Sequence, residues 1–168
     1  MVDKMKRFLT LLSAIGLISC DTFAGELVIV SSGRSKAKIV ASSQAPAVKF
    51  AGEELSRYIE KMTGAKLPVV KTDNSIGETK IVLEDADANL AFEEFSIGTK
   101  GRTIRISGGS PRAVLYGVYE LIEHFGCGFW SPVNESVPSL KKLSIDPKWK
   151  VVSKPAFAWR QVHSQYGY

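Results

Sequence analysis

An acidic segment in the middle of the chain has the spacing of a calcium-binding loop. Asp85, Asp87 and Asn89 offer side-chain oxygens at positions 1, 3 and 5, as an EF-hand does. Position 6 is Leu90 instead of glycine and position 12 is Ser96 instead of glutamate. We therefore expect a solvated acidic loop. The chain also lacks a His, Cys and Asp cluster with zinc spacing, so neither a metal site nor a cofactor is predicted.

A second candidate is the Gly-Gly-Ser-Pro-Arg segment from Gly108 to Arg112, between a predicted strand and a predicted helix. A helix that begins after a glycine-rich turn can hold a phosphate with its first backbone N–H groups. The segment has neither the Gly-Lys-Ser/Thr of a P-loop nor a G-x-G-x-x-G pattern, and Pro111 removes one N–H donor. The pattern therefore predicts a structural turn.

Two carboxylates, Glu120 and Glu123, lie three residues apart on the second predicted helix, a spacing that acid/base chemistry could use. Both lie off the apolar stripe of that helix, so we expect them to face solvent, as we do His124. A hydrolytic pair must instead converge on a pocket, with its carboxyl groups about 5 to 9.5 Å apart. No catalytic residue is predicted in this chain.

Length and composition favour one globular domain. The chain has 168 residues, of which 45% are apolar, 10% aromatic and 23% charged, with a formal charge of +5. Such a chain can bury enough apolar surface to offset the entropy of ordering it. A nucleic-acid-binding domain concentrates basic residues on one face, whereas here a small surplus is spread along the chain. Nucleic acid is therefore not a predicted partner.

The N-terminal segment has the features of a bacterial export signal. Lys4, Lys6 and Arg7 precede an apolar run of eleven residues, 8 to 18. A membrane-spanning helix needs about 20 apolar residues, so this run predicts a cleaved signal and not a transmembrane anchor.

The sequence after this run offers two alternative sites at which the signal peptide could be cleaved. Leu-Ile-Ser-Cys at 17–20 resembles a bacterial lipobox, which would make residues 1–19 a lipoprotein signal peptide and Cys20 the lipidated first residue. The chain would then lie at the cell envelope, attached to a membrane surface only through its lipid. The alternative is cleavage after Thr-Phe-Ala at 22–24, which would release a soluble periplasmic or secreted chain that begins at Gly25. Cys127 has no partner for a disulfide in either case and is expected to be buried.

Two amphipathic helices are predicted. The first begins near Ser43 and Pro46, ends at Gly64 and buries one apolar stripe, while its solvated face carries a Glu53–Arg57 pair. The second is capped by Ser110, begins at Pro111 and ends at Gly126; its apolar stripe is Val114, Leu115, Val118, Ile122 and Phe125. Gly117 interrupts this stripe, which predicts a close approach of the helix to a sheet.

Short runs rich in β-branched residues predict the strands of that sheet. They lie at 26–30, 38–41, 66–71, 80–84, 94–98 and 102–107. The first two runs are either two strands or one broken strand, and the last two form a hairpin through Lys100 and Gly101. Apolar residues alternate with polar ones, which is typical of a sheet with helices on one face and solvent on the other. Residues 129 to 150 predict a strand stub and an irregular return, with Trp149 packed against a neighbour.

Four stretches occur together in an order that is typical of one protein family. They are Ala51–Pro68, Gly108–Tyr119, Leu121–Trp130 and Lys154–Arg160. In these stretches the chain resembles the N-terminal domain of bacterial α-glucuronidase-like glycoside hydrolases, which is similar to the second domain of β-N-acetylhexosaminidases. It departs from that pattern at Ala113, where the family usually has glycine.

The resemblance implies an α+β fold: a two-layer sandwich with a mixed, mostly antiparallel sheet and two helices on one face. Residues 25–150 would form this domain, and residues 151–168 would begin a (β/α)₈ catalytic barrel. Phe157 to Arg160 would be the first barrel strand. Arg160 and His163, near its C-terminal end, would face a substrate in a complete enzyme.

A barrel takes about 250 residues and its catalytic residues come from the ends of several strands. Only eighteen residues follow Lys150, and the catalytic carboxylate pair of the family has no matching positions here. We therefore expect this chain to be inactive by itself. It would be a fragment, a truncated product, or a stand-alone relative of the accessory domain.

Two functions from different classes remain open. The first is a non-catalytic module of an exported glycoside hydrolase, which packs a face that includes Tyr116 and Trp130 against the catalytic barrel. The second is a free-standing surface lipoprotein that binds glycans. Its sugar rings would stack on exposed aromatic side chains, for which the candidates are Trp149, Trp159, Tyr166 and Tyr168.

Overall fold

The computed structural model describes residues 25–154 except positions 74, 76 and 132. It has two helices, α1 (Pro46–Thr63) and α2 (Pro111–His124). The strands in these ranges are β1 (Leu27–Ser31), β2 (Arg34–Ser35), β3 (Ala37–Ala41), β4 (Val69–Val70), β5 (Thr79–Glu84), β6 (Phe95–Lys100), β7 (Thr103–Gly108), β8 (Gly128–Ser131), β9 (Asn134–Ser136), β10 (Lys142–Ile145) and β11 (Val151–Ser153).

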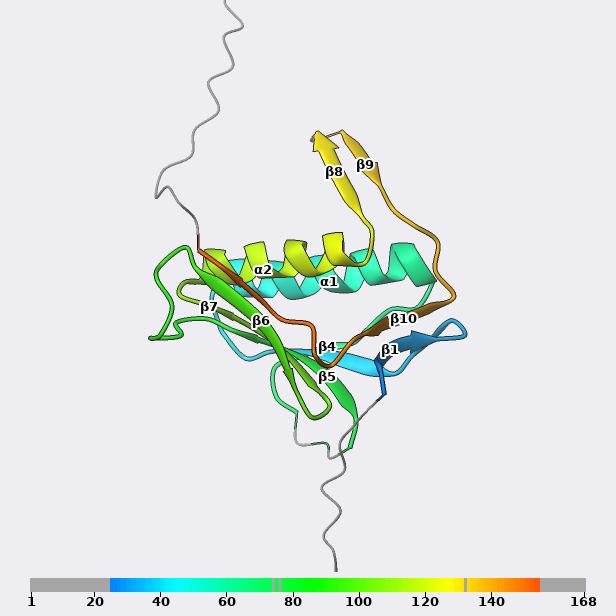
Figure 1. Cartoon of the computed structure of the whole chain (residues 1–168), viewed down its shortest axis with the longest axis horizontal. Coiled ribbons are helices and arrows are strands. Elements are labelled where there is room, and N and C mark those ends of the chain that lie inside the picture. The colour runs from blue at the N-terminus through cyan, green and yellow to red at the C-terminus, as the bar shows by residue number, and fades with distance from the viewer. Residues whose placement is uncertain (1–24, 74, 76, 132, 155–168) are drawn as a thin grey trace, which may run out of the picture.

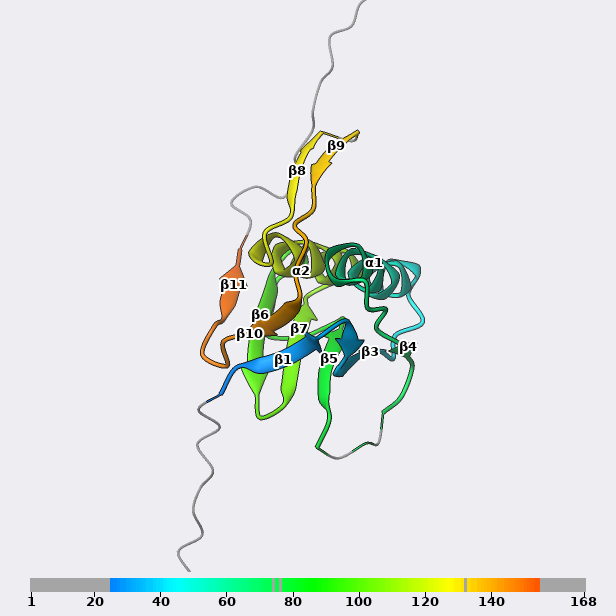
Figure 2. The same cartoon turned by 90° about the vertical axis from the view of Figure 1, so that its right-hand side faces the viewer.

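The main sheet is mixed and has the strand order β11-β6-β7-β5-β3-β4. Strands β7, β5, β3 and β4 are parallel to one another, whereas β6 and β11 run antiparallel to their neighbours. Both helices lie side by side over these strands, as the view along the helices shows (Figure 2). This is the predicted α+β fold, with two helices on one face of a mixed sheet.

A separate three-stranded sheet, β10-β1-β2, closes one side of the core. Its buried side chains, among them Leu27, Ile29 and Ile145, belong to the same apolar cluster as the main sheet and the helices. The segments 26–30 and 38–41 are thus two strands in two different sheets. Pairing of β1 with β10 joins the two ends of the described domain.

The predicted close approach of α2 to the sheet is present at Gly117. A Cβ atom at this position would lie 2.6 Å from Cγ2 of Ile106 in β7 and 3.2 Å from Cδ2 of Phe95 in β6. The glycine therefore sets how near α2 sits to the sheet. The predicted cap is also present, because the Ser110 hydroxyl accepts a hydrogen bond from the Ala113 N–H at 3.2 Å.

Helix α1 begins at Pro46, as predicted, but Ser43 is not its N-cap residue. Ala45 is the N-cap residue and makes no side-chain cap bond. Ser43 instead accepts from the Ala45 N–H and donates to Asp85. The predicted strand at 66–71 is reduced to the two residues of β4, since Pro68 has no N–H to give to a sheet.

The hairpin of β8 and β9 was predicted only as a strand stub and an irregular return. It rises from the end of α2 on the side of the helices that faces away from the sheets (Figure 1). The pairing is antiparallel, with Gly128 opposite Ser136 and Phe129 opposite Glu135.

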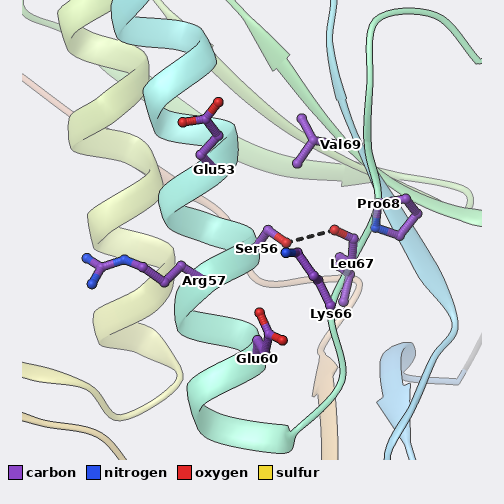
Figure 3. Close-up of a pocket in the computed structure, with 8 residues that line it drawn as sticks. All are labelled: Glu53, Ser56, Arg57, Glu60, Lys66, Leu67, Pro68 and Val69. Atoms are coloured by element: carbon purple, nitrogen blue, oxygen red, sulfur yellow. Dashed lines mark hydrogen bonds between the residues drawn. The ribbon is translucent and has the colours of Figure 1, made fainter.

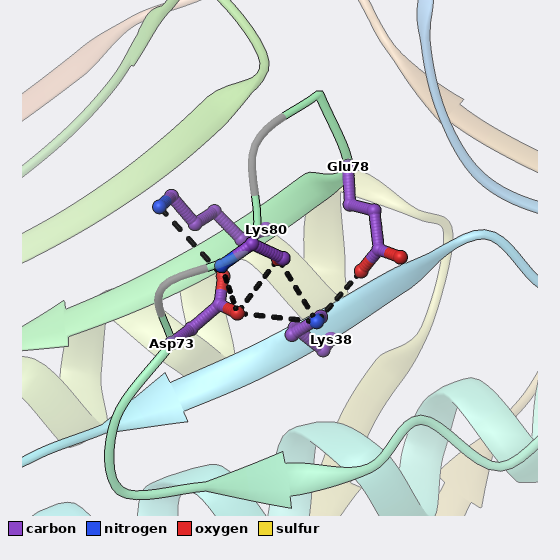
Figure 4. A network of polar contacts seen from close by, with 5 residues as sticks. Lys38, Asp73, Glu78 and Lys80 are labelled. Carbon is purple, nitrogen blue, oxygen red and sulfur yellow. Dashed lines mark hydrogen bonds and ion pairs between the residues drawn. The ribbon is translucent and has the colours of Figure 1, made fainter.

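A polar network ties the loop before β5 to the main sheet (Figure 4). Lys38 of β3 lies 3.2 Å from Asp73 and 2.6 Å from Glu78, and Lys80 of β5 lies 3.7 Å from Asp73. Hydrogen bonds from the side chain and backbone of Ser75, with the ammonium of Lys38, hold the pKa of Asp73 well below its usual range. All of these charges are paired, so the network fixes the loop.

Within the described ranges, neither helix is long and apolar enough to cross a membrane.

Candidate functional site

A concave corner lies where the outer face of the two helices meets the β8–β9 hairpin. It has a volume of about 810 Å³. We call it the helix-face pocket; its lining is Phe50, Glu54, Arg57, Tyr58, Tyr119, Glu123, Phe129, Trp130, Ser131, Val133, Asn134 and Glu135. These residues come from α1, α2 and the β8–β9 hairpin, which rises from the end of α2 (Figure 1).

The lining contains a buried carboxylate, Glu54, whose partners come from both helices. Arg57 donates two hydrogen bonds to it, at 2.9 and 2.6 Å, and the Tyr119 hydroxyl donates a third at 2.8 Å. Burial and the bond to Glu54 raise the pKa of Tyr119 to about 12, which keeps this phenol a donor. The predicted surface pair of Glu53 and Arg57 is therefore wrong, because Arg57 turns to Glu54 instead.

Glu135 holds the base of the hairpin against α1. Its carboxylate accepts from the Tyr58 hydroxyl at 2.5 Å and from the Lys61 ammonium at 2.6 Å. The bond from Lys61, and then that from Tyr58, lowers the pKa of Glu135. Burial, followed by the bond to Glu135, raises the pKa of Tyr58 to about 12. Glu135 is thus not poised as a general acid, which would need a raised pKa.

Three aromatic rings pack edge to face where the helices meet the hairpin. The Phe129 ring lies 5.3 Å from that of Tyr58 and 5.2 Å from that of Tyr119, at interplanar angles of 88° and 83°. The ring of Tyr58 also carries two cations, Arg57 at 4.6 Å and Lys61 at 4.9 Å from its centroid. These contacts fix the hairpin on the helices at its base.

Large apolar side chains remain exposed around this fixed base. Phe50 and Tyr116 on the helices are 47% and 38% exposed, and Trp130 and Val133 on the hairpin are 74% and 95% exposed. Phe50, Trp130 and Val133 line the helix-face pocket together, whereas Tyr116 lies outside its lining.

A second hollow, of about 600 Å³, lies between α1 and the segment that leads into β4 (Figure 3). The Ser56 hydroxyl bridges it by donating to the Leu67 carbonyl at 2.7 Å. The charged side chains of Glu53 and Glu60 stand along its rim on α1. This hollow is the seam where α1 packs beside the edge strand.

The acidic segment forms the loop between β5 and β6, and the glycine-rich turn connects β7 to α2. Asp85 accepts from Ser43, and Asp87 accepts from the backbone and side chain of Asn89. Among the described residues no group of three metal ligands exists. A Cβ atom on Gly109 would lie 2.0 Å from the Ala91 carbonyl oxygen, so the glycine lets two backbone segments cross.

The other chemical candidates do not converge. Glu123 and His124 are exposed and Glu120 is half-buried on α2. Cys127 is buried, and burial raises the pKa of its thiol, as expected of an inert side chain.

Trp149 stacks on the His124 ring at 4.0 Å and packs against the core, as predicted for a side chain held by a neighbour. Cys20, Arg160 and His163, the predicted lipidation and substrate-binding residues, lie outside the residues that the structure describes.

The mixed sheet with its two helices defines the class of protein: an accessory domain of glycoside hydrolases. Residues 25–125 match the family described as glycosyl hydrolase family 20, domain 2. The match covers more than half of the chain, which therefore belongs to this family. No curated protein matches the chain.

Solved structures of glycoside hydrolases share the fold. A family 115 4-O-methyl-alpha-glucuronidase with specificity for decorated arabinogalactans is 17% identical, with a TM-score of 0.59, over 76% of this chain and 18% of that one. A Streptomyces plicatus beta-hexosaminidase mutant in complex with GlcNAc is 14% identical, with a TM-score of 0.56, over 82% of this chain and 25% of that one.

A third structure of this kind is the family 20 beta-N-acetylhexosaminidase from Streptomyces coelicolor. It is 15% identical, with a TM-score of 0.56, over 82% of this chain and 25% of that one. The chain thus spans a quarter or less of the length of these enzymes, and at these identities the likeness is one of fold.

Proposed function

We propose that this chain is the non-catalytic N-terminal part of an exported glycoside hydrolase, and that its helix face docks against the catalytic domain. The observation that carries the proposal is the pair of exposed aromatic side chains, Phe50 and Tyr116, on a helix layer of which the β8–β9 hairpin covers only a part. Because the chain belongs to a family of glycoside hydrolase accessory domains, the partner we infer is the catalytic domain of such an enzyme.

The course of the last strand supports docking on this face. Strand β11 runs up the edge of the sheet toward the helix layer (Figure 2). Its final residue, Ser153, pairs with Phe95, whose ring lies beneath α2 at Gly117. A domain that follows β11 therefore starts beside α2. Residues 151–168 would begin it as a barrel, in which Arg160 and His163 face the substrate.

The nucleotide sequence downstream of Tyr168 tests the connection. We expect a (β/α)₈ barrel with a carboxylate pair, in the same frame or in an adjacent frame as expected of a truncated product. A locus with no barrel in any frame would contradict the proposal and favour a free-standing glycan-binding protein. The chain by itself should release no sugar from aryl glycosides. Turnover that a single carboxylate substitution abolishes would also contradict the proposal.

Docking is tested with the barrel produced as a second polypeptide. Phe50→Ser and Tyr116→Ser should each weaken the complex with the purified chain. Val69→Ser is the matched control, because Val69 is 41% exposed on β4, at the sheet edge opposite to β11. Equal losses in all three variants, or in none, would refute docking through the helix face.

Export and lipidation form the second part of the proposal. A signal peptide of residues 1–19 followed by a lipidated Cys20 would place the domain at a membrane surface of the cell envelope. The mass of the mature N-terminus tests this directly. A diacylglyceryl cysteine is expected, and Cys20→Ala should abolish lipidation; a mature chain that begins at Gly25 would show soluble export instead.

A further inference from the structure

Trp130 is the most exposed aromatic side chain in the described part of the chain, at 74%. We propose that it is a platform on which the helix-face pocket binds a pyranose ring of a glycan. The inference deepens the proposed function, because it gives the accessory domain a direct contact with the polysaccharide on which the enzyme acts.

The indole is held in place although it is exposed. Atoms Cζ2 and Cε2 of Trp130 lie 3.0 and 3.1 Å from the point where a Cβ atom of residue 128 would be. Gly128 therefore leaves room for the indole to lean on the backbone of its own strand. The side chain is 74% exposed, so most of the indole surface is open to a stacking ligand.

The hairpin that carries the indole is anchored at its base. Phe129 packs against the Tyr58 and Tyr119 rings, and Glu135 is bonded to Tyr58 and Lys61. A ligand that stacks on Trp130 therefore pays little entropy for ordering the site. Phe129 anchors the hairpin to the helices, so Trp130 is not needed for that packing and its indole stays available to a ligand.

Polar groups around the indole suit a hydroxylated ligand. Ser131 and Asn134 line the same corner from the hairpin, and Glu123 lines it from α2. Hydroxyl, amide and carboxylate groups can exchange hydrogen bonds with ring hydroxyls while the indole contacts the apolar C–H face of the ring.

The charges of the corner favour a neutral or weakly charged ligand. The carboxylates of Glu54 and Glu135 are balanced by Arg57 and Lys61 at 2.6 Å, which leaves Glu123 as the remaining charged side chain of the lining. A polyanion such as nucleic acid needs a concentrated basic surface, which this corner lacks. A protein contact at Trp130 is the alternative occupant that the experiment must separate from a glycan.

Affinity electrophoresis of the purified chain provides the test. The gels contain a neutral soluble glucan, a uronic-acid-bearing xylan, an arabinogalactan or glycol chitin. We expect at least one to retard the wild-type chain. Trp130→Ala should raise the dissociation constant obtained from the retardation about tenfold or more, as is typical when a tryptophan that the ligand covers is truncated. Trp130→Phe should retain part of the retardation, because a smaller ring remains.

Phe92→Ser is the control, because Phe92 is an aromatic side chain that is 66% exposed before β6 and lies outside the lining of the helix-face pocket. It should leave retardation unchanged, and thermal unfolding should show that every variant is folded. Migration unaffected by all four polysaccharides, or equal retardation of Trp130→Ala and wild type, would overturn the glycan site. If Trp130→Ala weakens only the complex with the barrel, Trp130 is a protein contact and the inference is wrong.

Failure of this inference is separable from failure of the proposed docking. Tyr116→Ser tests docking with the barrel without changing the glycan site, because Tyr116 lies outside the lining of the helix-face pocket whereas Phe50 belongs to it. Loss of docking with Trp130-dependent retardation intact would refute only the docking proposal. Docking through the helices with no retardation by any polysaccharide would refute only the glycan site.

Discussion

Replacing Gly117 with alanine tests how closely α2 must approach the sheet. The added methyl group would lie 2.6 Å from Cγ2 of Ile106, a side chain that is fully buried. Neither Ile106 nor the neighbouring Phe95 can move away without displacing other core residues. The helix must therefore lift from the sheet, or the core must adopt strained rotamers.

The expected loss of stability follows from two opposing effects. Alanine in a helix interior is more favourable than glycine by about 0.5–1 kcal/mol. Inserting a methyl group into a packed core costs about 1–3 kcal/mol. We therefore expect Gly117→Ala to lower the free energy of unfolding by about 1 kcal/mol, and by no more than about 2.5 kcal/mol.

Gly52 is the matched control, because it is the interior glycine of α1. A Cβ atom there would lie 3.2 Å from Cγ1 of Val69, which is 41% exposed on the edge strand β4 and can shift. Gly52→Ala should leave stability unchanged or raise it by up to about 1 kcal/mol. Urea unfolding measures both variants, with an unchanged slope as the sign that stability alone has changed. A Gly117→Ala protein as stable as Gly52→Ala would refute the close approach.

Three further predictions concern charged and phenolic groups. Alkaline titration of phenolate absorbance should show two of the five tyrosines ionising near pH 12 instead of 10, and Tyr58→Phe and Tyr119→Phe should each remove one of them. Asp73 has a lowered pKa, so its stabilisation is present above its ordinary value of 3.8 and is lost as the pH falls below it. Asp73→Asn should therefore flatten the acid dependence of the urea midpoint, and parallel curves would contradict this. Glu135→Gln should speed amide hydrogen exchange in β8 and β9 only. Exchange rates in these strands equal to those of the wild-type chain would show that Glu135 does not anchor the hairpin.

The helices could be predicted because their signals are local. An apolar stripe at helical spacing gave the buried face of α1, and a serine followed by proline located the start of α2. Gly64 ends α1 with a φ of 73°, a left-handed conformation that favours glycine. Each of these features depends on residues within one or two helical turns.

The buried Glu54 could not be predicted because its partners are set by tertiary packing. Helical spacing allows Arg57 to reach either Glu53 at i−4 or Glu54 at i−3. The choice depends on Tyr119, 65 residues further along the chain, whose hydroxyl also bonds to Glu54. The signal in the sequence was the position of Glu54, which lies next to Leu55 of the apolar stripe and one residue after Glu53 on the solvated face.

Sheet order is a second property that local patterns do not determine. The strands predicted at 26–30 and 38–41 have similar composition, yet β1 pairs with β10 and β3 pairs with β4 and β5. Strand β10 follows long after β1 in the chain, and its pairing depends on where the helices leave room. The hairpin of β8 and β9 was not predicted for a related reason. Its base is fixed by contacts with aromatic rings on α1 and α2, which lie far from it in the sequence.

The tryptophans show why exposure decides which aromatic side chain can bind a ligand. Trp149 lies in a basic, hydrophilic stretch and was a predicted sugar platform, but His124 stacks on its ring and the core holds its edge. Trp130 lies in an apolar stretch between Phe129 and Ser131, where sequence patterns favour burial. The absence of a side chain at Gly128 and the outward course of the hairpin leave its indole open instead. Whether a tryptophan can bind a ligand therefore depends on its neighbours in the folded chain. For Trp130 these are set by Gly128 and by the end of α2.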